Sequence, residues 1–150
     1  MANYYGMTRT NYFHVNDPEG LKKLMGRVVS DEGDIELWED KDENGNRVFA
    51  FGGYSSIIGI CPIENNNDDG EDEDFEGAEY DLFIKELQKL IVDGDAIIIT
   101  EVGHEKLRYL TAYSMIITKN DAQSIDLDRQ STRKASVMLD NPEYVTKTCY

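Results

Sequence analysis

Carboxylates dominate the side chains of this sequence that could bind or react. The 150 residues carry 30 acids and 15 bases, for a formal net charge of −15. Seventeen of the acids fall in two segments, 31–43 and 64–79, which together contain one base, Lys41. The remaining chain is nearly neutral, so the charge forms two concentrated negative patches. Such crowding costs the compact state some stability, and it serves either solubility or the binding of a partner.

Two stretches of these segments partly match a calcium-binding loop. Asp40–Gly45 has the D-x-D-x-N-G opening of an EF-hand loop, but Phe51 occupies the twelfth position, where a bidentate Glu is required. An Asn-Gly pair between two strand patterns favours a hairpin turn there. The second stretch keeps the spacing but lacks an Asp at its first position, an apolar anchor and a preceding helix. Its ligands would be Asn65, Asn67, Asp69 and Glu76. This set is a weak candidate metal site, and we expect no cofactor.

Nucleophilic or acid–base catalysis has little support in the sequence. The only histidines are His14, inside a strand pattern, and His104, inside an expected turn. No serine-hydrolase elbow, Cys/His motif, H-E-x-x-H motif or phosphate-binding loop is present. We interpret both histidines as structural or surface residues, and we expect a protein that is not an enzyme.

Composition also excludes several partners and environments. Binding to a phosphate backbone or an anionic membrane needs clustered Lys and Arg, and the bases here are dispersed. We therefore expect neither direct nucleic-acid binding nor membrane binding, and no apolar run is long enough to span a bilayer. Two cysteines, Cys61 and Cys149, are too few for a disulfide framework. A cytoplasmic location is the expectation that follows.

The N-terminal half alternates strand and helix patterns. Residues 8–15 are rich in β-branched and aromatic side chains and predict a strand. Asp17-Pro18 is a typical helix start, and an apolar stripe follows it to about Arg27. Residues 34–40 and 47–54 predict two strands around the Asn44-Gly45 turn, and residues 56–61 predict a further strand.

The C-terminal half repeats this alternation. A helix is predicted from Glu79 or Tyr80 to Asp93-Gly94, and an apolar strand, buried on both faces, over 96–100. We expect residues 102–105 to turn the chain into a long strand over 107–118. Asp126 predicts the N-cap of a last helix that ends near Leu139.

The resulting order predicts an α+β fold. We expect a mostly antiparallel sheet of about five strands with two to three helices packed on one face, and a ferredoxin-like core is its specific version. Residues 1–150 would form a single domain with an acidic loop at 64–78. The tail over 143–150 would be a short strand or mobile.

The predicted hairpin of residues 34–54, which contains most of the first acidic segment and is called the acidic hairpin below, suggests a function for the charge. Carboxylates at alternate strand positions lie about 6.6–6.8 Å apart and neighbouring strands about 4.8 Å apart. Duplex DNA presents about one charge per 1.7 Å of its axis, so a hairpin can imitate part of that array. Trp38, on the same strand face as Glu36, would be either an exposed anchor for a partner or a core residue beneath a helix.

Two further segments carry a family resemblance. Residues Thr8–Asp17 (TRTNYFHVND) and Glu101–Leu110 (EVGHEKLRYL) resemble small accessory proteins of bacterial conjugative elements, plasmids and phages. The resemblance spans most of the domain and brings no catalytic residues. It implies a genetic context in which antirestriction and anti-CRISPR inhibitors are common.

We therefore expect a non-enzymatic inhibitor of a host nucleic-acid-acting defence enzyme, which occupies a basic groove as an acidic mimic. A mobile-element binding or scaffold module with incidental acidity is the second hypothesis, and a small metal-dependent enzyme is the third. The sequence leaves the partner, the defence system and the oligomeric state open. The expected partner-binding residues are Glu36, Trp38, Glu39, Asp40, Asp42, Glu43, Asp68, Asp69, Glu71, Asp72, Glu73 and Asp74.

Overall fold

The structure, a computed structural model, describes residues 4–62, 77–105 and 109–146. The expected acidic loop therefore lies outside the described residues from 64 to 76, and so do the last four residues of the tail. The helices are α1 (Pro18–Met25), α2 (Tyr80–Leu90) and α3 (Leu127–Met138). The strands are β1 (Tyr5–Thr10), β2 (Val29–Ser30), β3 (Glu36–Lys41), β4 (Arg47–Gly53), β5 (Ile57–Gly59), β6 (Ile97–Glu105), β7 (Tyr109–Ile117) and β8 (Ala122–Asp126).

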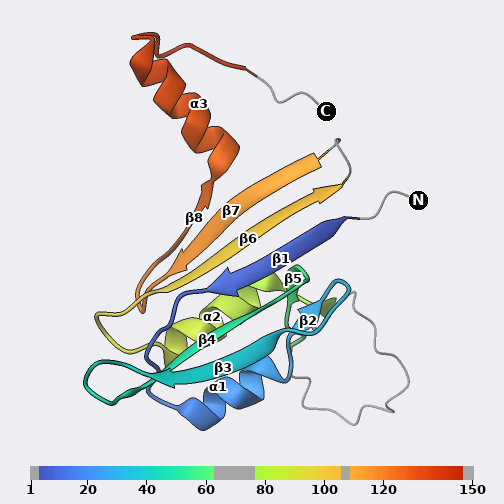
Figure 1. The fold of residues 1–150 in the computed structure, drawn as a ribbon, viewed down its shortest axis with the longest axis vertical. Coiled ribbons are helices and arrows are strands. Elements are labelled where there is room, and N and C mark those ends of the chain that lie inside the picture. The colour runs from blue at the N-terminus through green and yellow to red at the C-terminus, as the bar shows by residue number, and fades with distance from the viewer. Residues whose placement is uncertain (1–3, 63–76, 106–108, 147–150) are drawn as a thin grey trace.

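Six of these strands form one antiparallel sheet in the order β3-β4-β1-β6-β7-β8 (Figure 1). The short strands β2 and β5 pair separately. The α+β class and the mostly antiparallel sheet are thus confirmed. The sheet is larger than expected because β8, a mainly polar strand after Asp121, carries no apolar alternation that would reveal it.

Connectivity within the sheet is compatible with a ferredoxin-like core. Helix α1 connects β1 to β3, and β4 lies between those two strands. After β4 the chain passes through β5 and helix α2 to reach β6. In the sheet, β1 lies between β4 and β6. The strands β7 and β8 and the helix α3 extend this four-stranded core at its β6 edge (Figure 1).

Local sequence explains where α1 and α2 begin and which side they bury. The Asp17 side chain accepts a hydrogen bond from the Gly20 amide at 3.1 Å, and Pro18 opens α1, where its missing N–H is harmless. In α2 the residues Phe83, Ile84 and Leu87 are spaced at one helical turn and are all buried. Both helices therefore turn an apolar stripe toward the sheet.

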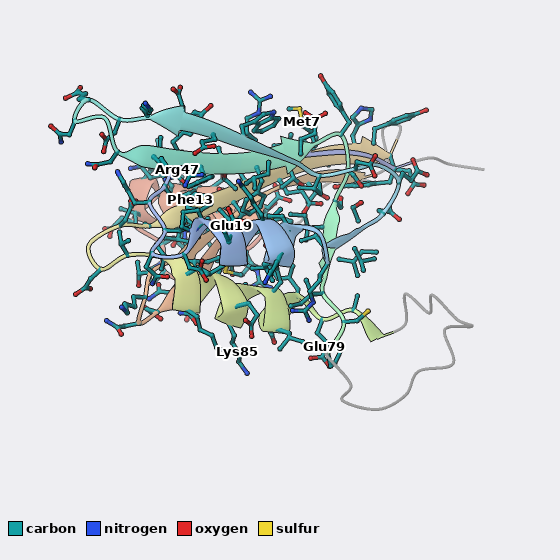
Figure 2. The ribbon with its side chains drawn as sticks, turned by 90° about the horizontal axis from the view of Figure 1, so that it is seen from below. Met7, Phe13, Glu19, Arg47, Glu79 and Lys85 are labelled. Atoms are coloured by element: carbon teal, nitrogen blue, oxygen red, sulfur yellow. The ribbon has the colours of Figure 1, made fainter. Side chains whose placement is uncertain are left out.

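The core lies between the sheet and these two helices. Figure 2 shows Phe13 in this layer, Met7 on the opposite side of the sheet, and Lys85 on the outer side of α2. The Phe51 ring meets Phe13 edge-on at 6.0 Å between centroids and Phe83 at 5.9 Å. Aromatic edge contacts of this kind stabilise a core beyond the burial of their area.

Three local expectations differ from the structure. Residues 102–105 do not turn the chain but continue β6, because the alternation of buried and exposed side chains runs unbroken to Glu105. Strand β6 is not buried on both faces: Ile98 and Thr100 are exposed. Helix α3 starts at its predicted cap, Asp126, but none of its residues is buried, so it does not join α1 and α2 on the sheet.

None of the helices in the described part of the chain is both long and apolar enough to cross a membrane.

The aromatic cluster yields a stability prediction. Phe51→Ala should lower the free energy of unfolding by about 3–5 kcal/mol, because it removes a fully buried ring and leaves a cavity. Denaturant unfolding followed by circular dichroism measures the change. Tyr54→Ala is the control, because the Tyr54 side chain is 85% exposed, and it should change stability by less than about 0.5 kcal/mol. Equal effects of the two substitutions would contradict this description of the core.

Candidate functional site

Helices α1 and α2 pack on one face of the sheet. The carboxylates of the acidic hairpin are divided between that face and the opposite one. We call the side away from α1 and α2 the open face. Pairing register places Glu36, Trp38 and Asp40 of β3 on the open face, opposite Gly52, Ala50 and Val48 of β4. The open face also carries Tyr5, Met7 and Arg9 from β1, and Ile98, Thr100, Val102 and His104 from β6.

Glu39 lies on the other face and is already paired. Its register partner is Phe49, whose ring belongs to the core. The Glu39 carboxylate accepts a hydrogen bond from the Arg47 side chain, which also lies over the Phe49 ring. This contact lowers the pKa of Glu39. The hairpin therefore does not present all its carboxylates on one surface.

Asp42 is engaged in holding the hairpin turn. Its Oδ1 accepts hydrogen bonds from the amides of Asn44 and Asn46, both at 2.9 Å, and Gly45 completes the turn with a φ of +80°. The predicted hairpin at Asn44-Gly45 is thereby confirmed. Glu43 is exposed at the tip of the same turn.

His14 links this turn to the body of the protein. Its Nε2 lies 2.7 Å from Asp42 Oδ2, and its Nδ1 lies 2.9 Å from Asp95 Oδ2. The His14 amide donates to the same Asp95 oxygen at 2.7 Å. These two carboxylates raise the pKa of His14, and the hydrogen bond from His14 is the largest cause that lowers the pKa of Asp42 to about 2. Hydrogen bonds from the His14 amide and ring lower the pKa of Asp95 despite its partial burial.

Trp38 is half-buried, and the side chain that lies over it is Arg9 of β1. The Arg9 guanidinium lies over the indole ring at 5.5 Å from its centroid. The two residues line an open pocket of about 290 Å³ together with Thr10, Tyr12 and Ala50. Since Trp38 lies on the face away from α1 and α2, it is not a core residue beneath a helix. A tryptophan with a stacked arginine is the kind of surface feature that anchors a partner.

Apolar side chains extend across the middle of the open face. Met7, Ile98 and Val102 remain 38–40% exposed, and the Tyr5 ring packs against the His104 ring at a tilt of 37°, with 5.7 Å between ring centroids. Large apolar side chains gathered on one surface are typical of a protein-binding area. Within the described residues no helix covers them.

A second polar cluster lies on the covered side, around Glu101. This side chain is only 6% exposed. Its carboxylate accepts hydrogen bonds from the Ser56 hydroxyl and from the Tyr113 hydroxyl, the latter at 2.5 Å. Burial is the largest cause that raises the pKa of Tyr113 far above its usual range, and the neighbouring Glu101 is the second cause. The same two causes raise the pKa of Tyr80 to about 12. All of these hydroxyls therefore stay protonated at neutral pH.

The Glu101 cluster is closed rather than reactive. The Tyr4 ring lies directly over Gly103 and leaves no room for a Cβ at that position. Both Glu101 oxygens are occupied by donors of the protein. We infer a structural role, in which two hydroxyls compensate a carboxylate that burial would otherwise penalise.

Metal ligation finds no geometric support in the described part of the chain. Within it, no group of three or more His, Cys, Asp or Glu side chains is arranged to hold an ion. Asp42 and Asp95 bind opposite nitrogens of the His14 ring, so they do not converge on a common point. The weak candidate set Asn65, Asn67, Asp69 and Glu76 lies outside the described residues, as do the acids at 68–74, and both stay predictions.

Sequence reasoning missed three of these residues, and two of them left a signal. Glu101 continues the alternation of Ile97 and Ile99 on the covered face, so a period-two reading of 97–101 would have placed a carboxylate in the core. Arg9 alternates with Thr8 and Thr10, so a period-two reading places it on the opposite, polar face of its strand. The pairing register then makes this the face of Trp38. Asp95 left no signal, because its contact with His14 joins residues 81 positions apart.

Comparison with known proteins finds no matching family, no matching curated protein and no matching solved structure at significant similarity. The resemblance to mobile-element proteins therefore stays a prediction.

The His14 bridge predicts a pH dependence of stability. Because the folded-state pKa of His14 lies above 6.5, its contribution is fully present below about pH 6.5 and is lost as pH rises through the folded value. The Asp42 contribution is present above about pH 3.8 and is lost as pH falls toward 2. Denaturant unfolding across about pH 2–9 should show both losses, and Asp42→Asn should shift the His14 NMR titration downward.

The matched control for this bridge is the other histidine. His104→Gln should keep the loss of stability at rising pH, whereas His14→Gln should remove it. A His14 titration midpoint at or below 6.5 in the folded wild type would refute the bridge.

The Glu101 cluster gives a second prediction. Tyr113→Phe should destabilise the fold by about 1.5–3 kcal/mol, because it removes a donor from a buried carboxylate. Thermal and denaturant unfolding measure the loss. The control is Tyr12→Phe, at a half-exposed ring, where we expect a change below about 0.5 kcal/mol. A Tyr113→Phe protein as stable as the control would show that Glu101 does not depend on this hydroxyl.

Proposed function

We propose that this chain is a non-enzymatic inhibitor of a host nucleic-acid-acting defence enzyme, of the antirestriction or anti-CRISPR kind. In this proposal it binds a basic groove of that enzyme with the β3 end of the open face. The observation that carries the proposal is the placement of Glu36 and Asp40 on either side of Trp38, on one uncovered surface.

The spacing of these groups suits a nucleic-acid-binding groove. Glu36, Trp38 and Asp40 alternate along β3, so neighbouring side chains of the set lie about 6.6–6.8 Å apart. Glu36 and Asp40 are two such intervals apart, about 13 Å, and phosphates along one DNA strand advance by about 3.4 Å per nucleotide, so the two carboxylates match phosphates about four nucleotides apart. The two carboxylates would meet basic side chains of the groove, and the indole would supply desolvated contact area.

Rigidity favours the hairpin over a free chain. Six residue pairs fix β3 against β4, from Glu36 opposite Gly52 to Lys41 opposite Arg47. The His14 bridge and the Asp42 turn hold the far end of the same hairpin. A preorganised surface loses little conformational entropy on binding, which leaves more of the contact energy for affinity.

The structure also narrows the proposed surface. Glu39 is paired with Arg47 on the covered face, and Asp42 is bound to His14 and to the turn. Of the exposed carboxylates in residues 36–43, this leaves Glu36, Asp40 and Glu43 for a partner. The acids at 68–74 remain a proposed second contact outside the described residues.

A second candidate function is favoured by the exposed apolar residues of the open face. Met7, Ile98 and Val102 would bind a partner through apolar contact, as a scaffold or binding module does, and the acidity would be incidental. Affinity would then change little with salt, whereas binding to a basic groove weakens as salt screens the charges.

The experiment captures partners from a host lysate and then tests competition. The triple variant Glu36→Lys, Asp40→Lys, Glu43→Lys should lose the captured enzyme. A duplex oligonucleotide should displace the enzyme from the wild-type protein, because both would occupy one groove. Restored cleavage by the enzyme in the presence of the triple variant would complete the link to inhibition.

The control variant makes the same change in charge elsewhere. Asp81→Lys, Asp93→Lys, Glu143→Lys reverses three exposed acids outside β3 and should bind like the wild type. If the variant with Glu36, Asp40 and Glu43 reversed still bound the enzyme, the hypothesis of nucleic-acid mimicry by this surface would be wrong. Binding that ignores both the oligonucleotide and salt would select the apolar scaffold function instead.

A further inference from the structure

We propose that His14 is a proton-dependent latch for the tip of the β3–β4 hairpin, residues 42–46. Protonated His14 holds the tip against the body of the protein, and neutral His14 releases it. The proposal concerns a movement of the free protein, and it does not depend on the proposed function.

The chemistry of three side chains makes both contacts of the His14 ring depend on one proton. From the hairpin, Asp42 Oδ2 faces Nε2 at 2.7 Å, and from the segment between α2 and β6, Asp95 Oδ2 faces Nδ1 at 2.9 Å. An ionised carboxylate only accepts hydrogen bonds, and a neutral imidazole has a single N–H to donate. Hydrogen bonds hold the pKa of both carboxyls below the usual range, for Asp95 despite its partial burial, so neither supplies a second proton at neutral pH. Both contacts therefore exist together only when the ring is protonated.

Asp95 stays with His14 whatever the charge of the ring. Its Oδ2 also accepts from the His14 amide at 2.7 Å, and its Oδ1 accepts from the Ala96 amide at 2.8 Å. The Val92 amide donates to the His14 carbonyl at 3.3 Å. These backbone donors do not titrate. When the ring releases its proton to solvent, the remaining N–H therefore stays on Nδ1, where it continues to donate to Asp95.

Asp42 depends on the proton because its other contacts stay within the turn. Its side chain accepts from the Asn44 and Asn46 amides, and its backbone pairs with Gly45 and Asn46. Within the described residues, the hydrogen bond with His14 is the one by which Asp42 reaches beyond the turn. In the neutral ring the lone pair of Nε2 faces the carboxylate, and two acceptors at this distance repel each other. The latch therefore opens at this contact.

The moving part is confined to the tip. The backbones of Phe13 and Phe49 exchange two hydrogen bonds, at 2.8 and 2.9 Å, and these fix β4 beside the latch. Beyond them the last residue pair of the hairpin is Lys41 opposite Arg47. Figure 1 shows the turn that follows projecting from the sheet, on the same side as the loop between α2 and β6. Opening of the latch therefore frees the tip and leaves the strands in place.

The test follows the tip by NMR in the full-length protein. Order parameters are taken from Cα–H relaxation, because these hydrogens do not exchange with water as pH rises. They are measured well below and well above the midpoint of the His14 titration, which the ring protons report in the same samples. Below the midpoint, residues 43–46 should match the flanking strands at about 0.85, and above it they should fall toward about 0.6. Equal values on both sides of the midpoint would overturn the latch.

Asp42→Asn should reverse the direction of this response. The carboxamide oxygen still accepts from the Asn44 and Asn46 amides, and the NH2 group then faces Nε2. This group donates to a neutral ring but meets a second donor when the ring is protonated. The tip of the variant should therefore be ordered above its own His14 midpoint and mobile below it. A response in the wild-type direction would contradict the proposal.

The matched control is His104→Gln, because it removes the other histidine of the chain and leaves the latch intact. Its tip should respond to pH like that of the wild type, whereas His14→Gln should abolish the response. If the tip still responded to pH in His14→Gln, another group would control it and the proposal would be wrong. The NMR spectrum checks that each variant is folded, and the wild-type comparison needs no variant.

Discussion

The limited cover that two short helices give a wide sheet is the constraint on which the rest of this structure depends. Helices α1 and α2 have eight and eleven residues, and each is about 10 Å across. Side by side they cover about 20 Å, which is the width of about four strands. The apolar core therefore lies mainly under β3, β4, β1 and β6, and it reaches Ile117 at the end of β7. Within the described residues no helix covers the other face of the sheet, and α3 and most of β8 extend beyond α1 and α2 at one edge.

Polar contacts hold the parts that the core does not reach. The His14 bridge ties the hairpin turn at Asp42 to Asp95, next to the start of β6. The Glu101 cluster ties β6 to β7 and to Ser56 beside β5. Each cluster includes a contact between residues far apart in the chain, such as His14 with Asp95 and Glu101 with Ser56, so each links elements that are not neighbours in the sequence. The His14 bridge also engages Asp42 and so removes one hairpin carboxylate from those available to a partner.

The two edges of the sheet differ in character. The β3 edge combines Trp38 with carboxylates on a rigid hairpin, and the β8 edge continues into the basic helix α3. The concentrated negative charge of the hairpin and the basic helix therefore lie at opposite ends of one sheet.

The sequence by itself determined the local elements and the fold class. Period and capping residues placed α1, α2, the start of α3 and the β3–β4 hairpin, because helix caps, the Asn44-Gly45 turn and apolar spacing act over a few residues. Only the tertiary structure decided that Glu39 and Asp42 are engaged, that Arg9 covers Trp38, and that α3 stands apart from the sheet. These outcomes depend on strand order and on contacts between distant residues, such as His14 with Asp95, and no local pattern encodes them.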